Sequence, residues 1–334
     1  MKIYFAAIES SSEKINYPKL YFEYTQKKKK LNVLMSYYYI KREPEKYFEK
    51  YSDFVNDFML DSGAYTFFDS GKNDEIKQHY NDFKNFIKSH TQLLSSKVSH
   101  TFTLDYNPTI YGFDENYKIY LELRELYQNI VPVIHQFSDD SGDDEIDGYS
   151  SKNPNIIAIG QILDVKGINK VRGLTINRQK LISTVNKIKN NFKCHLLGIT
   201  NYNILMDVMN IDTCDSRSWL LNSTTGKIFF NTKDKNGNLK DYTIHFPEYD
   251  KSNSSRDTKL INYDLWDKDL DRRDDIEIFH NEMKSIGLDI KDFRGYNHEL
   301  ARTLANFYYY EKMIEYINKE KDKSLEKVSY QKTI

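Results

Sequence analysis

Cysteine is nearly absent from this chain of 334 residues, which contains only Cys194 and Cys214. The two stand apart, without the CxxC or CxC spacing of a metal site, so the sequence encodes neither a disulfide framework nor a cysteine-rich zinc site. Because structural disulfides belong to oxidising compartments, their absence makes a cytoplasmic protein the expectation.

Long apolar runs and an excess of one charge are lacking as well. No stretch approaches the ~18 uninterrupted apolar residues of a membrane span, so we expect no membrane insertion. The opening MKIYFAAIESSS lacks the length and cleavage site of a signal peptide and fits a first strand. With 48 Lys and Arg against 49 Asp and Glu, the chain has no global basic excess. Any contact with nucleic acid must therefore come from local patches.

Short apolar runs instead alternate with longer charged segments, which is typical of βα units and a parallel sheet. The segments between the runs place apolar residues at three- and four-residue spacings, so helices are expected at 43–55, 74–94, 114–128 and 178–192. Strands are expected at the eight runs 2–8, 32–39, 57–63, 100–106, 130–136, 156–162, 194–200 and 211–217. This count predicts an α/β fold, a (β/α)8 TIM barrel whose core occupies residues 1–224.

The pattern changes after the eighth run. Two β-like arms surround Asn236-Gly237, a strong turn signal, and predict a β-hairpin appendage over 225–250. The remainder, 251–334, is expected to begin as an exposed polar connection. A long amphipathic helix within 294–320 then forms a C-terminal helical appendage that packs on the barrel. The last dozen residues are expected to be disordered.

Polar residues gather at the predicted carboxyl ends of the strands, where the active site of a parallel barrel lies. Such a set suits a planar, purine-like ligand, because carboxylates accept from ring N–H and amino groups and a glutamine both donates and accepts. Two carboxylates on opposite sides of a glycosidic carbon are also the groups that retaining glycosyl transfer uses. The set comprises Asp61, Ser62, Asp105, His135, Gln136, Gly160, Gln161, Thr200 and Asp215.

Simpler interpretations stand beside this one. An aspartate at a strand end often caps the following helix, and Tyr65 belongs either to the core or to a stacking surface for a planar ligand. The small residues after Asp61 favour close approach of a ligand to the backbone. His195 is interpreted as structural, and His135 as either structural or a substrate contact.

The ordered motifs LDSGAY, IIAIGQ, HLLGIT and IDTCDSRSW resemble those of the tRNA-guanine transglycosylases. A weaker likeness continues into the hairpin and into 305–317. The resemblance implies that Asp215 is the nucleophile that attacks C1′ of a guanosine and that Asp61 is the acid/base for the base nitrogen. It further implies that Asp105, Gln136 and the Gly160 backbone recognise the edge of the heterocycle, that Tyr65 and Leu197 sandwich its faces, that Asn107 senses the substituent at ring position seven, and that Ser62, Gln161 and Gly198 complete the base site.

Two further residues follow the proposed nucleophile. Arg217 is placed to meet a flanking phosphate. Trp219 is either a core residue or a wedge beside the extracted nucleotide. Both are candidate contacts with nucleic acid.

Departures from the family matter for the substrate. Members that act on tRNA carry a cysteine-rich zinc site, and the matching region 247–300 has no cysteine, so neither metal nor cofactor is expected. Ala64 and Gln161 replace a glycine and a glutamate. This form resembles phage-type relatives that insert 7-deazaguanines into DNA.

The expected function is therefore exchange of guanine in DNA for a base such as 7-cyano-7-deazaguanine (preQ0), in the cytoplasm of the host cell if a phage encodes the chain. The alternatives are exchange in tRNA, a catalytically silent barrel that binds nucleic acid or a purine, and a retaining glycosidase.

Overall fold

The computed structural model describes residues 1–10, 15–64, 67, 73–106, 108–135, 141–160, 178–237, 239–246, 261–294 and 299–331. The chain forms two compact units. The first comprises residues 1–15 and 31–216, and the second comprises residues 16–30 and 217–334.

The first unit is built on a sheet in which every strand pairing is parallel. Its order is β5-β4-β3-β2-β1-β9-β8-β7-β6. The strands are β1 (Lys2–Ala6), β2 (Leu31–Ser36), β3 (Val55–Asp61), β4 (Val98–Phe102), β5 (Ile130–Val131), β6 (Val133–Ile134), β7 (Ile156–Ile159), β8 (Lys193–Leu196) and β9 (Thr213–Ser216).

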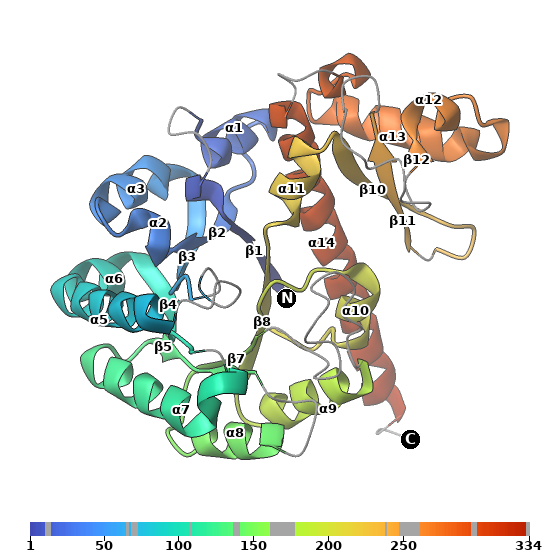
Figure 1. Cartoon of the computed structure of the whole chain (residues 1–334). Helices are drawn as coiled ribbons and strands as arrows, with labels where there is room; N and C mark the ends of the chain where they lie inside the picture. The colour runs from blue at the N-terminus through green and yellow to red at the C-terminus, as the bar shows by residue number, and fades with distance from the viewer. Residues whose placement is uncertain are drawn as a thin grey trace. The chain divides into compact units, whose positions relative to one another are not determined.

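Strands β5 and β6 are two halves of one run, and they close the barrel. They are separated by Pro132, which has no N–H to give to a ladder, while its carbonyl oxygen still accepts from the Ala158 amide at 2.9 Å. The chain at this point therefore joins β4 on one side to β7 on the other. The eight predicted runs are all found, and the (β/α)8 barrel is confirmed (Figure 1).

Helices surround this sheet (Figure 1). The four predicted helices correspond to α3, α5 with α6, α7 and α9, whereas the acidic helix α8 was not predicted. No helix in the described ranges is both long enough and apolar enough to cross a membrane. The helical elements are η1 (Ile8–Ser10), α2 (Tyr37–Ile40), α3 (Pro44–Tyr51), η2 (Ser52–Phe54), α5 (Asn73–Ser89), α6 (Thr91–Lys97), α7 (Pro108–Leu126), α8 (Ser141–Ser150), α9 (Arg178–Lys189) and α10 (Tyr202–Asp207).

Side chains fill the inside of the barrel. Inward-facing residues of β1 to β7 form one buried cluster, which consists of Tyr4, Leu34, Met59, Phe102, Val131, Val133, Ile156 and Ala158. The interior is thus a packed core, as in other barrels of this kind, and not a pore. Chemistry is consequently confined to the ends of the strands.

The second unit combines a small sheet with helices. Strands β10 (Lys227–Lys233) and β11 (Leu239–His245) pair antiparallel and form the predicted hairpin, and β12 (Ile261–Asn262) pairs parallel to β11. The helical elements are α1 (Tyr17–Tyr24), α11 (Ser218–Thr224), α12 (Tyr263–Trp266), η6 (Leu270–Arg272), α13 (Arg273–Ser285), η7 (Ile290–Phe293) and α14 (Glu299–Gln331). Two expectations were wrong: residues 261–275 are folded elements, and α14 continues to Gln331, because residues 321–331 are rich in helix-forming Lys, Glu and Leu and contain no Pro or Gly.

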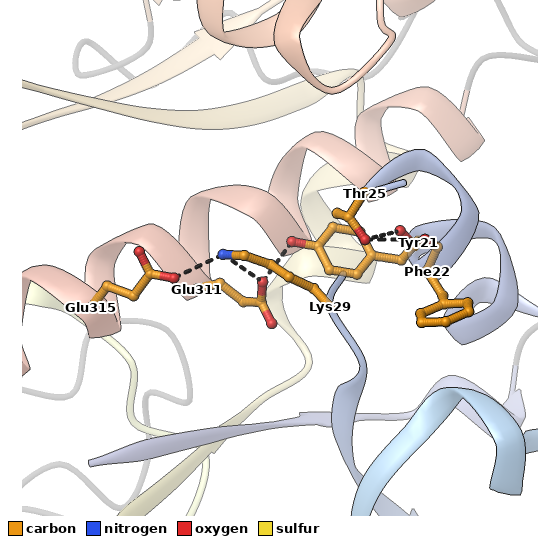
Figure 2. Close-up of polar contacts among 6 residues, drawn as sticks. All are labelled: Tyr21, Phe22, Thr25, Lys29, Glu311 and Glu315. Carbon is orange, nitrogen blue, oxygen red and sulfur yellow. Dashed lines mark hydrogen bonds and ion pairs between the residues drawn. The ribbon is translucent and has the colours of Figure 1, made fainter. Parts of the chain in front are cut away.

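Polar contacts tie the segment 16–30 to α14 (Figure 2). The Tyr21 hydroxyl donates to Glu311 at 2.7 Å, and the Lys29 ammonium lies 3.3 Å from Glu311 and 2.8 Å from Glu315. At the end of α1, the Thr25 hydroxyl donates to the Tyr21 carbonyl oxygen at 2.9 Å. A segment that lies between two barrel strands in the sequence is therefore an integral part of the second unit.

Candidate active site

Three carboxylates predicted at strand ends face one another at the mouth of the barrel. Asp61 ends β3, Asp105 follows β4 and Asp215 lies in β9. Burial raises the pKa of Asp61 to about 6, and repulsion from Asp215 and then Asp105 adds to this effect, although hydrogen bonds from Gly63 and Ser62 oppose it. Asp61 therefore carries a proton much more readily near neutral pH than an ordinary aspartate does.

Asp215 is held in one orientation by two donors. Its Oδ1 accepts from the Gly198 amide at 2.8 Å and lies 3.2 Å from Nε2 of His195. Gly198 adopts a φ of +68°, which glycine tolerates best, and this explains the glycine in LLGIT. Asp215 is only 5% exposed, and its Oδ2 receives no hydrogen bond from the described residues. Two donors on one oxygen leave the other oriented for attack.

His195, interpreted from the sequence as structural, contacts the proposed nucleophile directly. It is fully buried, its ring packs 4.8 Å from that of Phe102, and its Nδ1 lies 2.8 Å from the Thr213 hydroxyl. If the ring is neutral, Nε2 donates to the carboxylate and Nδ1 must accept from Thr213. The residues His195 and Thr213 are partners in the register of β8 and β9. Their side chains thus form a relay that ends on Asp215.

Asp105 forms a buried pair with a second histidine. Its Oδ2 lies 2.8 Å from Nε2 of His135, whose backbone amide donates to Glu145 at 3.0 Å. Burial raises the pKa of Asp105, while His135 opposes this shift. Burial disfavours the charged form of His135, but attraction to Asp105 and Glu145 outweighs it and raises the pKa of the ring. The contact observed for His135 is thus with a candidate site residue, Asp105.

Gly160 makes room for this histidine. A Cβ at position 160 would lie 2.7 Å from Cε1 and Nδ1 of His135 and 2.9 Å from Cγ1 of Val133. Its amide already donates to the carbonyl oxygen of Ile134 at 2.9 Å. The backbone N–H of Gly160 is therefore a sheet donor, so a contact of the Gly160 backbone with the edge of a heterocycle has to use other backbone atoms at this strand end.

The turn after Asp61 is fixed by its own hydrogen bonds. The Gly63 amide donates to Asp61 Oδ2 at 2.9 Å, and the carbonyl oxygen of buried Ser62 lies 2.8 Å from Nε2 of His79. Gly63 adopts a φ of +77°, and a Cβ there would lie 2.8 Å from Cβ of Tyr38. Asp61 thus accepts a hydrogen bond from the turn that follows it, while it also faces the other carboxylates.

Glu9 is a fourth carboxyl at the mouth, and the sequence analysis missed it. It is 5% exposed, its Oε1 accepts from the Ser36 amide at 2.8 Å, and its buried Oε2 has no partner among the described residues. Burial raises the pKa of Glu9 to about 7, and repulsion from Asp61 contributes. Glu9 lies in η1, just after β1. The search for polar residues at the carboxyl ends of strands, if applied to β1 as well, would have found it.

The other predicted residues are placed as follows. Leu197 is partly buried and packs against the barrel core. Arg217 is exposed at the start of α11, in the second unit. Four residues lie outside the described ranges, namely Tyr65, Asn107, Gln136 and Gln161.

Of the two interpretations of Trp219, a core residue or a wedge beside the nucleotide, the core residue is the one observed. Trp219 is fully buried, with its ring 4.8 Å from that of Phe307 and 5.6 Å from that of Tyr17. An indole this large gains more by burial in the second unit than by exposure. It is a core residue there.

Among the described residues, no group of three histidine, cysteine or acidic side chains is arranged to hold a metal ion. The charged or ionisable site residues discussed above are carboxyls and imidazoles. One carboxylate fixed by an amide and an imidazole, beside a second carboxyl with a raised pKa, has the parts for nucleophilic displacement with acid/base assistance. A scan of the sequence against models of known protein families finds no match, and a search of curated proteins finds none either.

Proposed function

We propose that this chain is a glycosyltransferase that exchanges guanine in DNA for a 7-deazaguanine, such as 7-cyano-7-deazaguanine, through a covalent bond between Asp215 and the sugar. The observation that supports it best is the contrast between two neighbouring carboxyls. Asp215 is fixed by Gly198 and His195, while burial and repulsion raise the pKa of Asp61 to about 6. Environments that separate two carboxyls in this way are how enzymes assign one as nucleophile and the other as acid.

The first step breaks the bond between C1′ and N9 of the guanine. An oxygen of Asp215 forms a bond to C1′, Asp61 gives its proton to the departing base, and guanine leaves with the bonding electron pair. In the second step the ionised Asp61 takes the proton from the ring nitrogen of the incoming base. That nitrogen attacks C1′ and displaces Asp215, so the configuration at C1′ is retained.

Two departures from the motifs of the enzymes that act on tRNA favour DNA as the polymer. Region 247–300 contains no cysteine, and Ala64 and Gln161 stand at motif positions where the tRNA enzymes have other residues. Because C1′ of a stacked nucleotide is inaccessible to a buried carboxylate, the guanosine has to be flipped out of a duplex or offered in a single strand.

The test is base exchange on each polymer separately. Labelled guanine is incubated with DNA and with tRNA, and incorporation is measured for the wild-type chain and for Asp215→Asn. Incorporation into DNA, together with a covalent protein–DNA adduct that Asp215→Asn abolishes, is the expected result. Incorporation into tRNA alone would reassign the polymer, whereas unchanged exchange by Asp215→Asn would refute the mechanism. Mass spectrometry of nucleosides after incubation with deazaguanines then identifies the inserted base.

A further inference from the structure

The pair of His135 and Asp105 has no part in the displacement at C1′, yet several contacts hold it at the mouth. The imidazole meets Asp105 through Nε2 at 2.8 Å, and the backbone amide of the same residue is held by Glu145. On the other side of the ring, Gly160 leaves no room for a methyl group. The ring is therefore confined to the orientation that faces Asp105.

The two oxygens of Asp105 are used unequally. Oδ2 meets the imidazole, whereas Oδ1 is buried and has no partner among the described residues. A buried carboxylate oxygen that lacks a donor costs free energy, and such an atom in a native protein calls for an explanation. A ligand that brings an N–H donor to Oδ1 supplies one.

The charges around the ring favour a positive imidazole. Asp105 faces it from the segment after β4 and Glu145 from α8, and burial is the effect that opposes protonation. Tyr149 of α8 also lies near both carboxylates, but burial raises its pKa well above the ordinary value, so it stays neutral. A cation on Oδ2 opposes the rise that burial causes in the pKa of Asp105, and in the ionised carboxylate Oδ1 acts only as an acceptor.

We propose that His135 is a positioning residue that keeps Asp105 ionised with Oδ1 presented as an acceptor, and that the pair selects bases with adjacent N–H donors over bases with a ring-nitrogen acceptor at the same edge. Guanine and the 7-deazaguanines offer a ring N–H beside an amino group, whereas adenine offers an unprotonated ring nitrogen. That nitrogen and the carboxylate oxygen are both acceptors, so their lone pairs would repel each other. The identity of the ligand in this inference rests on the proposed function.

The proposal gives Gly160 a role through His135. Gly160→Ala would push the ring off Asp105 without changing either member of the pair. It should therefore reproduce the selectivity defect of a histidine substitution, which a purely local packing role of the glycine does not predict.

Two measurements on the full chain test the proposal. In the first, NMR titration follows the His135 ring without any ligand. We expect its pKa to lie above the ordinary 6.5 in the wild type and to fall in Asp105→Asn. A ring pKa that Asp105→Asn leaves unchanged overturns the pairing, whatever the chain catalyses.

The second measurement is calorimetric binding of guanine and of adenine to the wild type, His135→Gln, His135→Phe and Gly160→Ala. His135→Gln retains an N–H donor and serves if the phenylalanine variant does not fold, and His90→Gln is the matched control on a histidine in another part of the unit. We expect guanine to bind roughly tenfold or more weakly to the His135 and Gly160 variants, since a hydrogen bond to a charged group is lost or weakened. The ratio of guanine to adenine affinity should fall with it.

The outcomes separate the two proposals. A wild type that exchanges guanine, with His135 variants whose guanine affinity and selectivity are unchanged, overturns this inference and leaves the proposed function standing. A wild type that binds no purine overturns both.

Discussion

His195 lies 3.2 Å from Asp215 through its Nε2, and neither side chain is more than 8% exposed. The imidazole and the carboxylate come from neighbouring parallel strands, and the Thr213 hydroxyl holds the far nitrogen of the ring at 2.8 Å. Because a buried donor to a carboxylate fixes its orientation, this contact directs the oxygen of Asp215 that is not engaged by His195 and Gly198.

Replacement of His195 by phenylalanine should slow exchange more than it weakens binding. The variant removes one of two donors to Oδ1, so the carboxylate loses its fixed orientation, and kcat should fall by roughly 10- to 1000-fold, as for removal of other preorganised donors. Thr213→Val should have a smaller effect, because it removes only the partner of Nδ1. Steady-state kinetics, with His90→Gln as the control, checks both. Equal kcat in the wild type and His195→Phe would remove His195 from the mechanism.

Glu9→Gln should stabilise the protein at high pH and not at low pH. A carboxyl whose pKa is raised in the folded state binds its proton more tightly there than in the unfolded chain. Folding is therefore unaffected below about pH 4 and is penalised as pH rises through the folded pKa of about 7. The penalty at pH 8 is of the order of 3 kcal/mol, and glutamine removes it.

Urea denaturation of Glu9→Gln at pH 5 and pH 8 measures this difference. Glu277→Gln, which changes an exposed glutamate of α13, is the matched control and should show no pH-dependent gain. A stability difference between Glu9→Gln and the wild type that is the same at both pH values would contradict the prediction.

Gly63→Ala should destabilise the fold and displace Asp61. The residue has a φ of +77°, and the new Cβ would lie 2.8 Å from Cβ of Tyr38. Gly237 provides a comparison, because it has a φ of +82° but a Cβ at that position would meet no atom within 4 Å. Gly237→Ala should cost only the backbone strain, about 1 kcal/mol, and Gly63→Ala clearly more. Thermal unfolding checks the difference, and exchange activity should be lost only in Gly63→Ala.

Arg217 and Trp219 should respond to substitution in opposite ways. Trp219→Ala removes a fully buried ring and should destabilise the protein by about 3–5 kcal/mol. Arg217→Ala changes an exposed side chain and should leave stability within about 0.5 kcal/mol. If Arg217 contacts a phosphate, its removal weakens DNA binding for all sequences alike and lowers the salt slope by about 1. Filter binding at several salt concentrations measures that slope.

The fold was largely predictable because eight apolar runs alternate with helix-period segments, and this pattern depends on local sequence alone. The residues at which the strands end were less predictable. The run 32–39 was expected as one strand, yet Tyr37–Ile40 form a helix, and β8 stops at Leu196. Where a strand ends depends on pairing with its neighbours, which the sequence of one segment does not contain.

The site was predictable where residues stand at the ends of single strands, as Asp61 and Asp215 do. The site was not predictable where the role of a residue depends on a partner far along the chain. The role of His195 depends on its contact with a carboxylate 20 residues later, and the position of Glu9 is fixed by the Ser36 amide 27 residues later. The sequence could not decide between the two interpretations of Trp219, because its neighbours in space, Tyr17 and Phe307, lie far from it along the chain.

The bond from Tyr21 to Glu311 spans 290 positions of the chain. During synthesis α1 is made between β1 and β2, whereas α14, which contacts its polar side chains, is made after all the barrel strands. Tyr21 and Lys29 therefore lack their partners Glu311 and Glu315 until all the barrel strands have been made. A gene truncated before α14 leaves this segment without its partners, and a single cut through the coding sequence cannot yield the second unit whole, because residues 16–30 remain with the barrel strands.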